Sequence, residues 1–206
     1  MTPEEFAARL DVSRETLSRV EAYLALLERW QKAINLVGRG TLADPWRRHI
    51  LDSAQLLPHL PSEPADLYDL GSGAGLPGLV LAIMGRSGVH LVESDRRKVQ
   101  FLREACRILD LPVEVHADRI ESLPDGSADV VTSRALAPLP RLIGLAAPLL
   151  RPNAVCLFLK GRSQSDELTQ ARKCWRIKTQ SIPSLTDPSG SLLKLWDIGR
   201  APLHRQ

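Results

Sequence analysis

The stretch Asp69-Leu70-Gly71-Ser72-Gly73-Ala74-Gly75-Leu76-Pro77-Gly78 decides the fold. It follows the apolar run Leu67–Leu70, which we predict to be a strand, and it leads into an apolar segment with helical spacing. Glycines at such a turn let the backbone bend tightly and approach a bound ligand closely. A strand, a glycine-rich turn and a helix in this order predict a nucleoside-binding βα unit.

From residue 65 onward the chain alternates short apolar runs with helical segments. We predict strands at Leu67–Leu70, Val89–Glu93, Val113–His116, Asp129–Thr132 and Val155–Leu159, and helices around Leu79–Met84, Arg97–Leu109, Leu139–Leu150 and Asp166–Trp175. This alternation predicts βαβ units and a mostly parallel sheet. The last apolar runs, Ile177–Ile182 and Leu192–Ile198, fit a hairpin that closes one edge of the sheet.

The first sixty residues have a different, helical texture. Ser13 is a candidate N-cap before apolar residues at helical spacing, and Asp44-Pro45 is a second helix start. The Pro58–Pro64 stretch then reads as a linker. We therefore expect an α/β fold, a Rossmann-like sheet over residues 65–206 with an N-terminal helical segment over residues 1–60.

Composition sets the broad class. The chain has 206 residues, 44% of them hydrophobic, and a net charge of only +3, so any nucleic-acid binding must come from local clusters of charge. The three cysteines are widely spaced and form no zinc-binding pattern, so we expect neither a disulfide framework nor a metal. The acidic start of the chain is unlike a signal peptide, and no apolar stretch is long enough to span a bilayer. We expect a cytoplasmic protein that does not associate with membranes.

Two cofactors compete for the glycine turn. Gly73, Gly75 and Gly78 match the spacing of dinucleotide-binding proteins, whereas the frame that starts at Asp69 matches enzymes that use S-adenosylmethionine. The second frame begins directly at the strand end, and an acid at Asp69 would favour a sulfonium and disfavour a pyrophosphate. Glu93 ends the next strand, where a carboxylate can accept hydrogen bonds from both ribose hydroxyls of an adenosine.

The ends of the later strands add further candidates. Ile120 and Glu121 follow the third strand and would lie beside the adenine. Arg134 follows the fourth strand. Its side chain could contact the cofactor, contact an RNA phosphate, or form an ion pair on the surface. Lys160 and Arg162 follow the fifth, where two cations would suit a polyanion.

No residue is predicted to act as a general base or nucleophile. The loop after the fourth strand lacks the Asn/Asp-Pro-Pro-aromatic motif typical of amine methylation, and it lacks the cysteine nucleophile that pyrimidine methylation at C5 requires. On the N-terminal helix, Arg47 and Arg48 are candidate RNA contacts. His49 and Asp52 fit either an RNA-facing role or a hydrogen-bonding role between the helix and the core.

Taken together, these motifs resemble the small-subunit rRNA guanine-N7 methyltransferase G family, also called glucose-inhibited division protein B. The resemblance runs from about Leu27 to Gly161. It rests on Trp30, Ile34-Asn35-Leu36, Arg48-His49-x-x-Asp52-Ser53, the glycine turn with its Gly-Leu-Pro-Gly end, Arg97-x-x-Phe101-Leu102-Arg103, Ser133-Arg134-Ala135 and Lys160-Gly161. The part from Ser163 onward matches weakly, so no site is inferred from it.

The resemblance implies S-adenosylmethionine-dependent methylation of guanine N7 in 16S rRNA near the decoding centre, by a chain that we expect to be a monomer. It implies cofactor contacts at Gly71, Leu76, Ile120, Glu121 and Arg134, to which the turn geometry adds Gly73 and Gly75 and the ribose argument adds Glu93. Two alternatives remain open at this point: a methyltransferase for a small molecule or a protein, and a nucleoside-binding module without catalysis.

Overall fold

The computed structural model describes residues 1–62 and 65–201. It has a sheet of seven strands in the order β3-β2-β1-β4-β5-β7-β6. The strands are β1 (Leu67–Leu70), β2 (Val89–Val92), β3 (Glu114–His116), β4 (Ala128–Arg134), β5 (Leu150–Lys160), β6 (Trp175–Pro183) and β7 (Ser191–Arg200). β1 to β5 pair in parallel, while β7 runs antiparallel to both β5 and β6. The predicted parallel sheet and its closing hairpin are thus confirmed.

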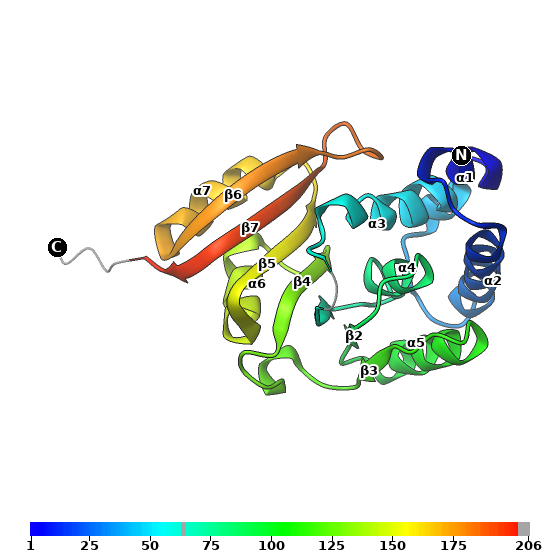
Figure 1. Ribbon diagram of the computed structural model, residues 1–206, viewed down its shortest axis with the longest axis horizontal. Helices are drawn as coiled ribbons and strands as arrows, with labels where there is room; N and C mark the ends of the chain where they lie inside the picture. Colours follow the sequence, from blue (N-terminus) through cyan, green and yellow to red (C-terminus); the bar gives the residue numbers. More distant parts are fainter. Residues whose placement is uncertain (63–64, 202–206) are drawn as a thin grey trace.

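Helices cover both faces of the sheet (Figure 1). They are α1 (Pro3–Leu10), α2 (Arg14–Gln31), α3 (Asp52–Ala54), α4 (Gly78–Ile83), α5 (Arg96–Ile108), α6 (Leu139–Ala146) and α7 (Gln164–Cys174). Short 3-10 turns occupy η1 (Arg39–Ala43), η3 (Leu57–His59), η4 (Ile120–Ser122) and η5 (Ala147–Leu149). α4 and α5 pack with the N-terminal helices on one face, and α6 and α7 pack on the other.

The N-terminal segment shares its core with the sheet. Phe6, Val20 and Ile50 are fully buried in the same hydrophobic cluster as residues of α4 and α5. Tyr23 of α2 is also fully buried, and its hydroxyl donates a hydrogen bond of 2.7 Å to the carbonyl of Ala74 in the glycine turn. Helices that lie first in the sequence therefore support the turn that decides the fold.

Some predicted boundaries differ from those of the structure. The helix expected after Asp44 begins instead as a π-helical segment, η2 (Trp46–Leu51), although Asp44 does accept a hydrogen bond from the amide of Arg47. The helix expected over Leu139–Leu150 ends at Ala146, and the 3-10 turn η5 then leads into β5 at Leu150. The predicted linker Pro58–Pro64 lies partly outside the described residues.

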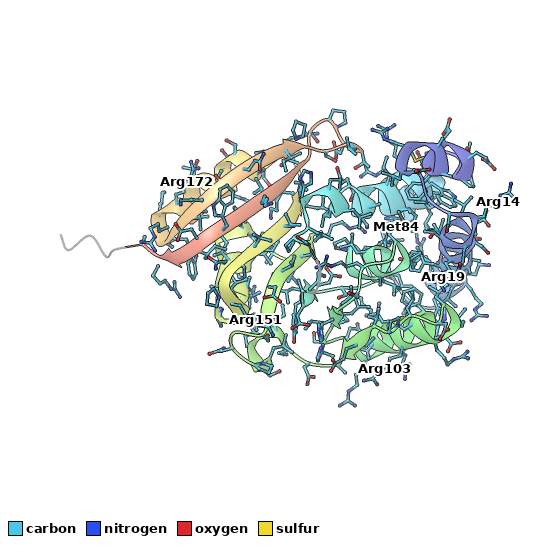
Figure 2. All side chains as sticks on the ribbon, viewed as in Figure 1. Arg14, Arg19, Met84, Arg103, Arg151 and Arg172 are labelled. Carbon is cyan, nitrogen blue, oxygen red and sulfur yellow. The ribbon has the colours of Figure 1, made fainter. Side chains whose placement is uncertain are left out.

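Arginines are spread widely over the surface. In Figure 2, Arg14 and Arg103 project outward from α2 and α5, away from the sheet. The preference of the chain for arginine therefore does not by itself locate an RNA-binding face. Within residues 1–62 and 65–201, no helix combines the length and apolar character needed to cross a membrane.

Candidate functional site

The glycine turn bends sharply where β1 ends. Gly73 has φ +57° and Gly75 has φ +85°, in the left-handed region that favours glycine. A Cβ on Gly75 would lie 2.6 Å from the Cβ of Leu79, so Gly75 is packed against α4. At Gly73 the nearest atom to such a Cβ would be the carbonyl oxygen of Gly71, 3.8 Å away. The turn therefore packs against α4 at Gly75, whereas no protein atom occupies the space next to Gly73.

A cavity of about 650 Å³ lies in front of this turn, at the carboxyl ends of the parallel strands. Seven of the eight predicted cofactor residues line it: Gly71, Gly73, Leu76, Glu93, Ile120, Glu121 and Arg134. The exception is Gly75, which is not among the lining residues. The absence of a side chain at Gly75 lets the backbone pass close to Leu79 of α4.

Glu93 connects the second strand to the turn. Its Oε2 accepts a hydrogen bond of 3.0 Å from the amide of Gly73, and its Oε1 accepts one of 2.8 Å from the amide of Asp95. The residue is only 8% exposed, and it lines the cavity. Each carboxylate oxygen has a second lone pair, so Glu93 can still accept hydroxyl donors from a ligand.

Asp69 does not have the position that its place in the motif suggested. The sequence argument put its carboxylate near the charged end of the cofactor, but Asp69 is fully buried and does not line the cavity. Its Oδ2 accepts a hydrogen bond from the amide of Gly78, and its Oδ1 accepts one from the hydroxyl of Thr132. Burial raises the pKa of Asp69 to about 6, with these hydrogen bonds opposing the rise. Asp69 therefore joins β1, β4 and the start of α4.

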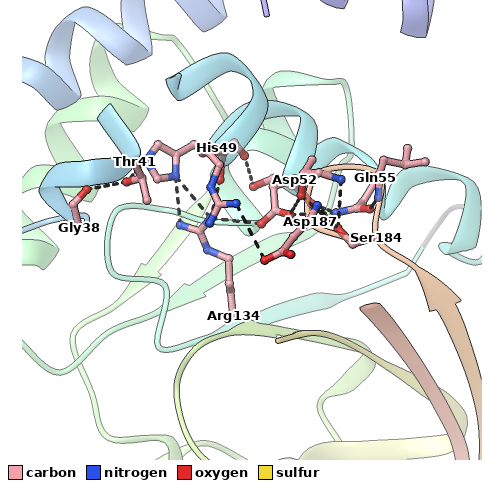
Figure 3. Close-up of polar contacts among 12 residues, drawn as sticks. Gly38, Thr41, His49, Asp52, Gln55, Arg134, Ser184 and Asp187 are labelled. Carbon is pink, nitrogen blue, oxygen red and sulfur yellow. Dashed lines mark hydrogen bonds and ion pairs between the residues drawn. The ribbon is translucent and has the colours of Figure 1, made fainter. Parts of the chain in front are cut away.

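Arg134 connects the strand edge to the N-terminal helix (Figure 3). Its Nη1 donates to the carbonyl of Arg48 at 3.1 Å and lies 3.3 Å from Oδ2 of Asp52. Both Nη atoms also lie 3.4 Å from Nδ1 of His49. The side chain of Arg134 is 22% exposed and lines the cavity, so it is not an ordinary surface ion pair.

His49 is held as a neutral ring. Thr41 donates its hydroxyl proton to the carbonyl of Gly38, so its oxygen accepts a hydrogen bond from Nε2 of His49. Nδ1 then carries the lone pair that faces Arg134. Burial, and then the charges of Arg134 and Arg48, lower the pKa of His49 to about 4. Of the two roles left open for His49 and Asp52, the structure shows hydrogen bonding between the N-terminal segment and the core.

The turn between β6 and β7 completes this side of the site. The hydroxyl of Thr186 donates to Oδ1 of Asp52, and the amide of Leu185 donates to the side-chain oxygen of Gln55. A second hollow of about 310 Å³ lies under this turn. It shares Arg48, Asp52, Arg134 and Ala135 with the first cavity, so the two hollows adjoin each other.

The four cations predicted to bind RNA are not equivalent. Lys160 is paired within the protein: its side chain is 8% exposed, forms an ion pair of 2.6 Å with Glu167 and donates to the carbonyl of Ala137. Arg162 is exposed beside it. Arg48 lines both hollows, whereas Arg47 lines a separate depression next to Met1.

Several lining residues were not predicted from the sequence. The loop residues Val37, Gly38 and Thr41 form one wall of the cavity, and the cations Lys98 and Arg141 lie on others. Lys98 had a usable signal, because it lies in the first turn of the helix that follows Glu93. The loop at residues 36–41 had none, since it reaches the cavity only through the packing of α2.

The topology decides between the two cofactor classes. Dinucleotide-binding sheets of the classic type are parallel with strand order 3-2-1-4-5-6, whereas here an antiparallel β7 is inserted between β5 and β6. With an acid at the end of β2 facing an open glycine turn, the chain is an S-adenosylmethionine-dependent methyltransferase of the Rossmann-like class.

Solved structures share this fold at low sequence identity. A SAM-dependent methyltransferase from Aquifex aeolicus superposes with a TM-score of 0.59 and 17% identity, over 77% of this chain and 95% of that one. A TehB-like SAM-dependent methyltransferase from Corynebacterium glutamicum gives a TM-score of 0.58 and 15% identity, over 85% and 97%.

Sequence comparison identifies the family. The family model for rRNA small subunit methyltransferase G matches residues 16–192. Proteins named ribosomal RNA small subunit methyltransferase G are 56% identical in Rhodospirillum rubrum, over 98% of this chain and 100% of that protein, and 54% identical in Paramagnetospirillum magneticum, over 97% and 98%. The chain belongs to the rRNA small subunit methyltransferase G family.

Proposed function

We propose that this chain transfers the methyl group of S-adenosylmethionine to N7 of a guanosine in 16S rRNA. The observation that carries the proposal is the cavity of about 650 Å³ between the open glycine turn and Glu93, which adjoins a second hollow at Arg134. Two adjoining hollows provide one place for a cofactor and one for an acceptor base. Membership of the rRNA methyltransferase family supports RNA as the acceptor.

The lining residues fit the parts of this cofactor. Glu93 would accept the ribose hydroxyls, and Ile120 with Glu121 would lie against the adenine. Gly71, Gly73 and Leu76 would border the methionine portion, and the missing side chain of Gly73 leaves the space in front of the turn open. Arg134 would stand between the cofactor and the second hollow, since it lines both.

The acceptor atom explains why no general base is needed. N7 of guanine carries an in-plane lone pair and no proton, and the cofactor supplies a methyl group already activated on a sulfonium. His49 is neutral and fully occupied by Thr41 and Arg134, so it is not poised to remove a proton. The task of the chain is alignment, an effect worth up to roughly 7–11 kcal/mol.

The substrate must expose N7. In A-form RNA this atom faces a deep, narrow major groove that side chains cannot read. We therefore propose that the target guanosine lies in an open loop or in a partly assembled small subunit, near the decoding centre as the family resemblance implies. We further propose that the enzyme acts as a cytoplasmic monomer, with exposed Arg48 and Arg162 contacting phosphates.

The direct test is methyl transfer from tritiated S-adenosylmethionine to small-subunit particles that lack the modification. Nucleoside mass spectrometry should then find N7-methylguanosine, at one position in 16S rRNA. Methylation of another atom would overturn the N7 assignment. Cofactor binding without transfer to RNA or particles would favour a different substrate or a nucleoside-binding module.

A further inference from the structure

A cluster of imidazoles lies on the sheet face over β1, β2 and β3. Between β3 and β4 the described chain forms only the short turn η4, so no long helix follows β3. Tyr68 pairs in register with His90, and their rings stack 4.3 Å apart. His90 pairs in register with Glu114, and His116 lies two residues further along β3 on the same face.

Three ligand atoms converge within this cluster. Nδ1 of His90 lies 3.1 Å from Nε2 of His116 and 3.3 Å from Oε2 of Glu114. Nε2 of His116 lies 3.8 Å from Oε1 of the same carboxylate. A tetrahedral zinc ion with bonds of about 2.0–2.1 Å places its ligand atoms roughly 3.3 Å from one another. One ligand atom from each of the three residues can be chosen so that all lie within 4.8 Å of one another, so the cluster is slightly wider than a tetrahedral zinc site and would close around a bound ion.

The surroundings also suit a metal centre. Histidines that bind metals usually donate their other ring nitrogen to a carboxylate; here Oδ1 of Asp66 lies 3.7 Å from Nε2 of His90, beyond hydrogen-bond distance but on the correct side of the ring. Stacking on Tyr68 fixes the plane of the His90 ring. The two histidine side chains are 16% and 18% exposed and that of Glu114 is 65% exposed, so the cluster is open to solvent. A water molecule can therefore supply a fourth ligand.

We propose that His90, Glu114 and His116 bind one divalent transition-metal ion of the zinc type. We predicted no metal from the spacing of the cysteines and the isolation of His49 in the sequence, whereas the partners of His90 are brought together only by strand pairing. A bound ion would tie β2 to the edge strand β3. It would thereby steady the loop after β3, whose residues Asp118 to Glu121 line the cofactor cavity.

The test is a zinc titration of the untagged full-length chain after treatment with a chelator, by calorimetry, with bound metal counted by mass spectrometry. We expect one ion per chain and a rise in melting temperature on adding Zn²⁺. His116→Gln should abolish the site. Glu114→Gln should weaken it while the protein stays folded, because that side chain is exposed. His59→Gln, on η3 and outside the cluster, is the matched control and should bind one ion like the wild type.

Two results would overturn the proposal. One is the absence of zinc binding by the folded wild-type chain, which would leave the cluster as hydrogen-bonded imidazoles beside a carboxylate. The other is unchanged stoichiometry and affinity in folded Glu114→Gln and His116→Gln, which would place the ion elsewhere. Both readouts are independent of methyl transfer, so the proposed function can fail or succeed separately.

Discussion

Replacing Gly73 by alanine should separate the binding role of the glycine turn from its structural role. The substitution places a Cβ at φ +57°, which costs about 1–2 kcal/mol, but the Cβ meets no atom closer than 3.8 Å. The variant should therefore fold, with a melting temperature lower by roughly 2–8 °C. Its new methyl group would enter the cavity, and overpacking of a fitted site costs about 1–3 kcal/mol. Affinity for S-adenosylmethionine should then fall by about 5- to 150-fold.

Gly126 provides a matched control for this experiment. It has φ +63°, nothing lies within 4 Å of its added Cβ, and it is not among the residues that line the cavity. Gly126→Ala should show a similar loss of stability with unchanged cofactor affinity, measured by calorimetry alongside urea unfolding. Wild-type affinity in a folded Gly73→Ala variant would refute the assignment. Equal losses of affinity in both variants would show that backbone strain alone is responsible.

Three further outcomes follow from the site. Glu93→Ala should weaken S-adenosylmethionine binding by roughly 1.5–3 kcal/mol in calorimetry, and an unchanged dissociation constant would remove Glu93 from the ribose site. The pKa of His49 is lowered from 6.5 to about 4 in the folded protein, so as the pH falls the unfolded chain binds the proton first. The free energy of unfolding of the wild type, relative to that of His49→Gln, should therefore fall by roughly 3 kcal/mol between pH 6.5 and pH 4 in urea unfolding. A difference that stays constant over this range would contradict the assignment. Arg162→Ala should reduce the slope of log K for RNA binding against log salt concentration by about 0.7. Lys160→Met should leave this slope unchanged and lower the free energy of unfolding. The reverse pattern would make Lys160 the phosphate contact.

The sequence predicted correctly those parts of the site that depend on residues close together in the chain. The glycine turn follows from its own residues, and Glu93 follows from the spacing between successive strand ends. Both therefore lie at the cavity as expected. Asp69 shows the limit of this reasoning. All four residues of β1 are buried, so alternation along the strand could not reveal which face its carboxylate joins.

Contacts between distant segments were beyond the sequence argument. Tyr23 reaches Ala74 across 51 positions, and Thr186 reaches Asp52 across 134. The burial of Lys160 depends on where α7 places Glu167, and helix packing is not encoded in the spacing at the strand end. The positions that could not be predicted are those at which tertiary packing, rather than chain order, chooses the partner.

The contact between Thr186 and Asp52 has a consequence for synthesis of the protein. Asp52 is translated in the first third of the chain, yet the hydroxyl that holds it belongs to the connection between the last two strands. A nascent chain that stops before this connection would contain the glycine turn and Glu93 but not the completed wall beside Asp52. The wall of the second hollow, which we assign to the acceptor base, is therefore completed only when the connection between β6 and β7 has been made, whereas the residues that line the cofactor cavity all come before it.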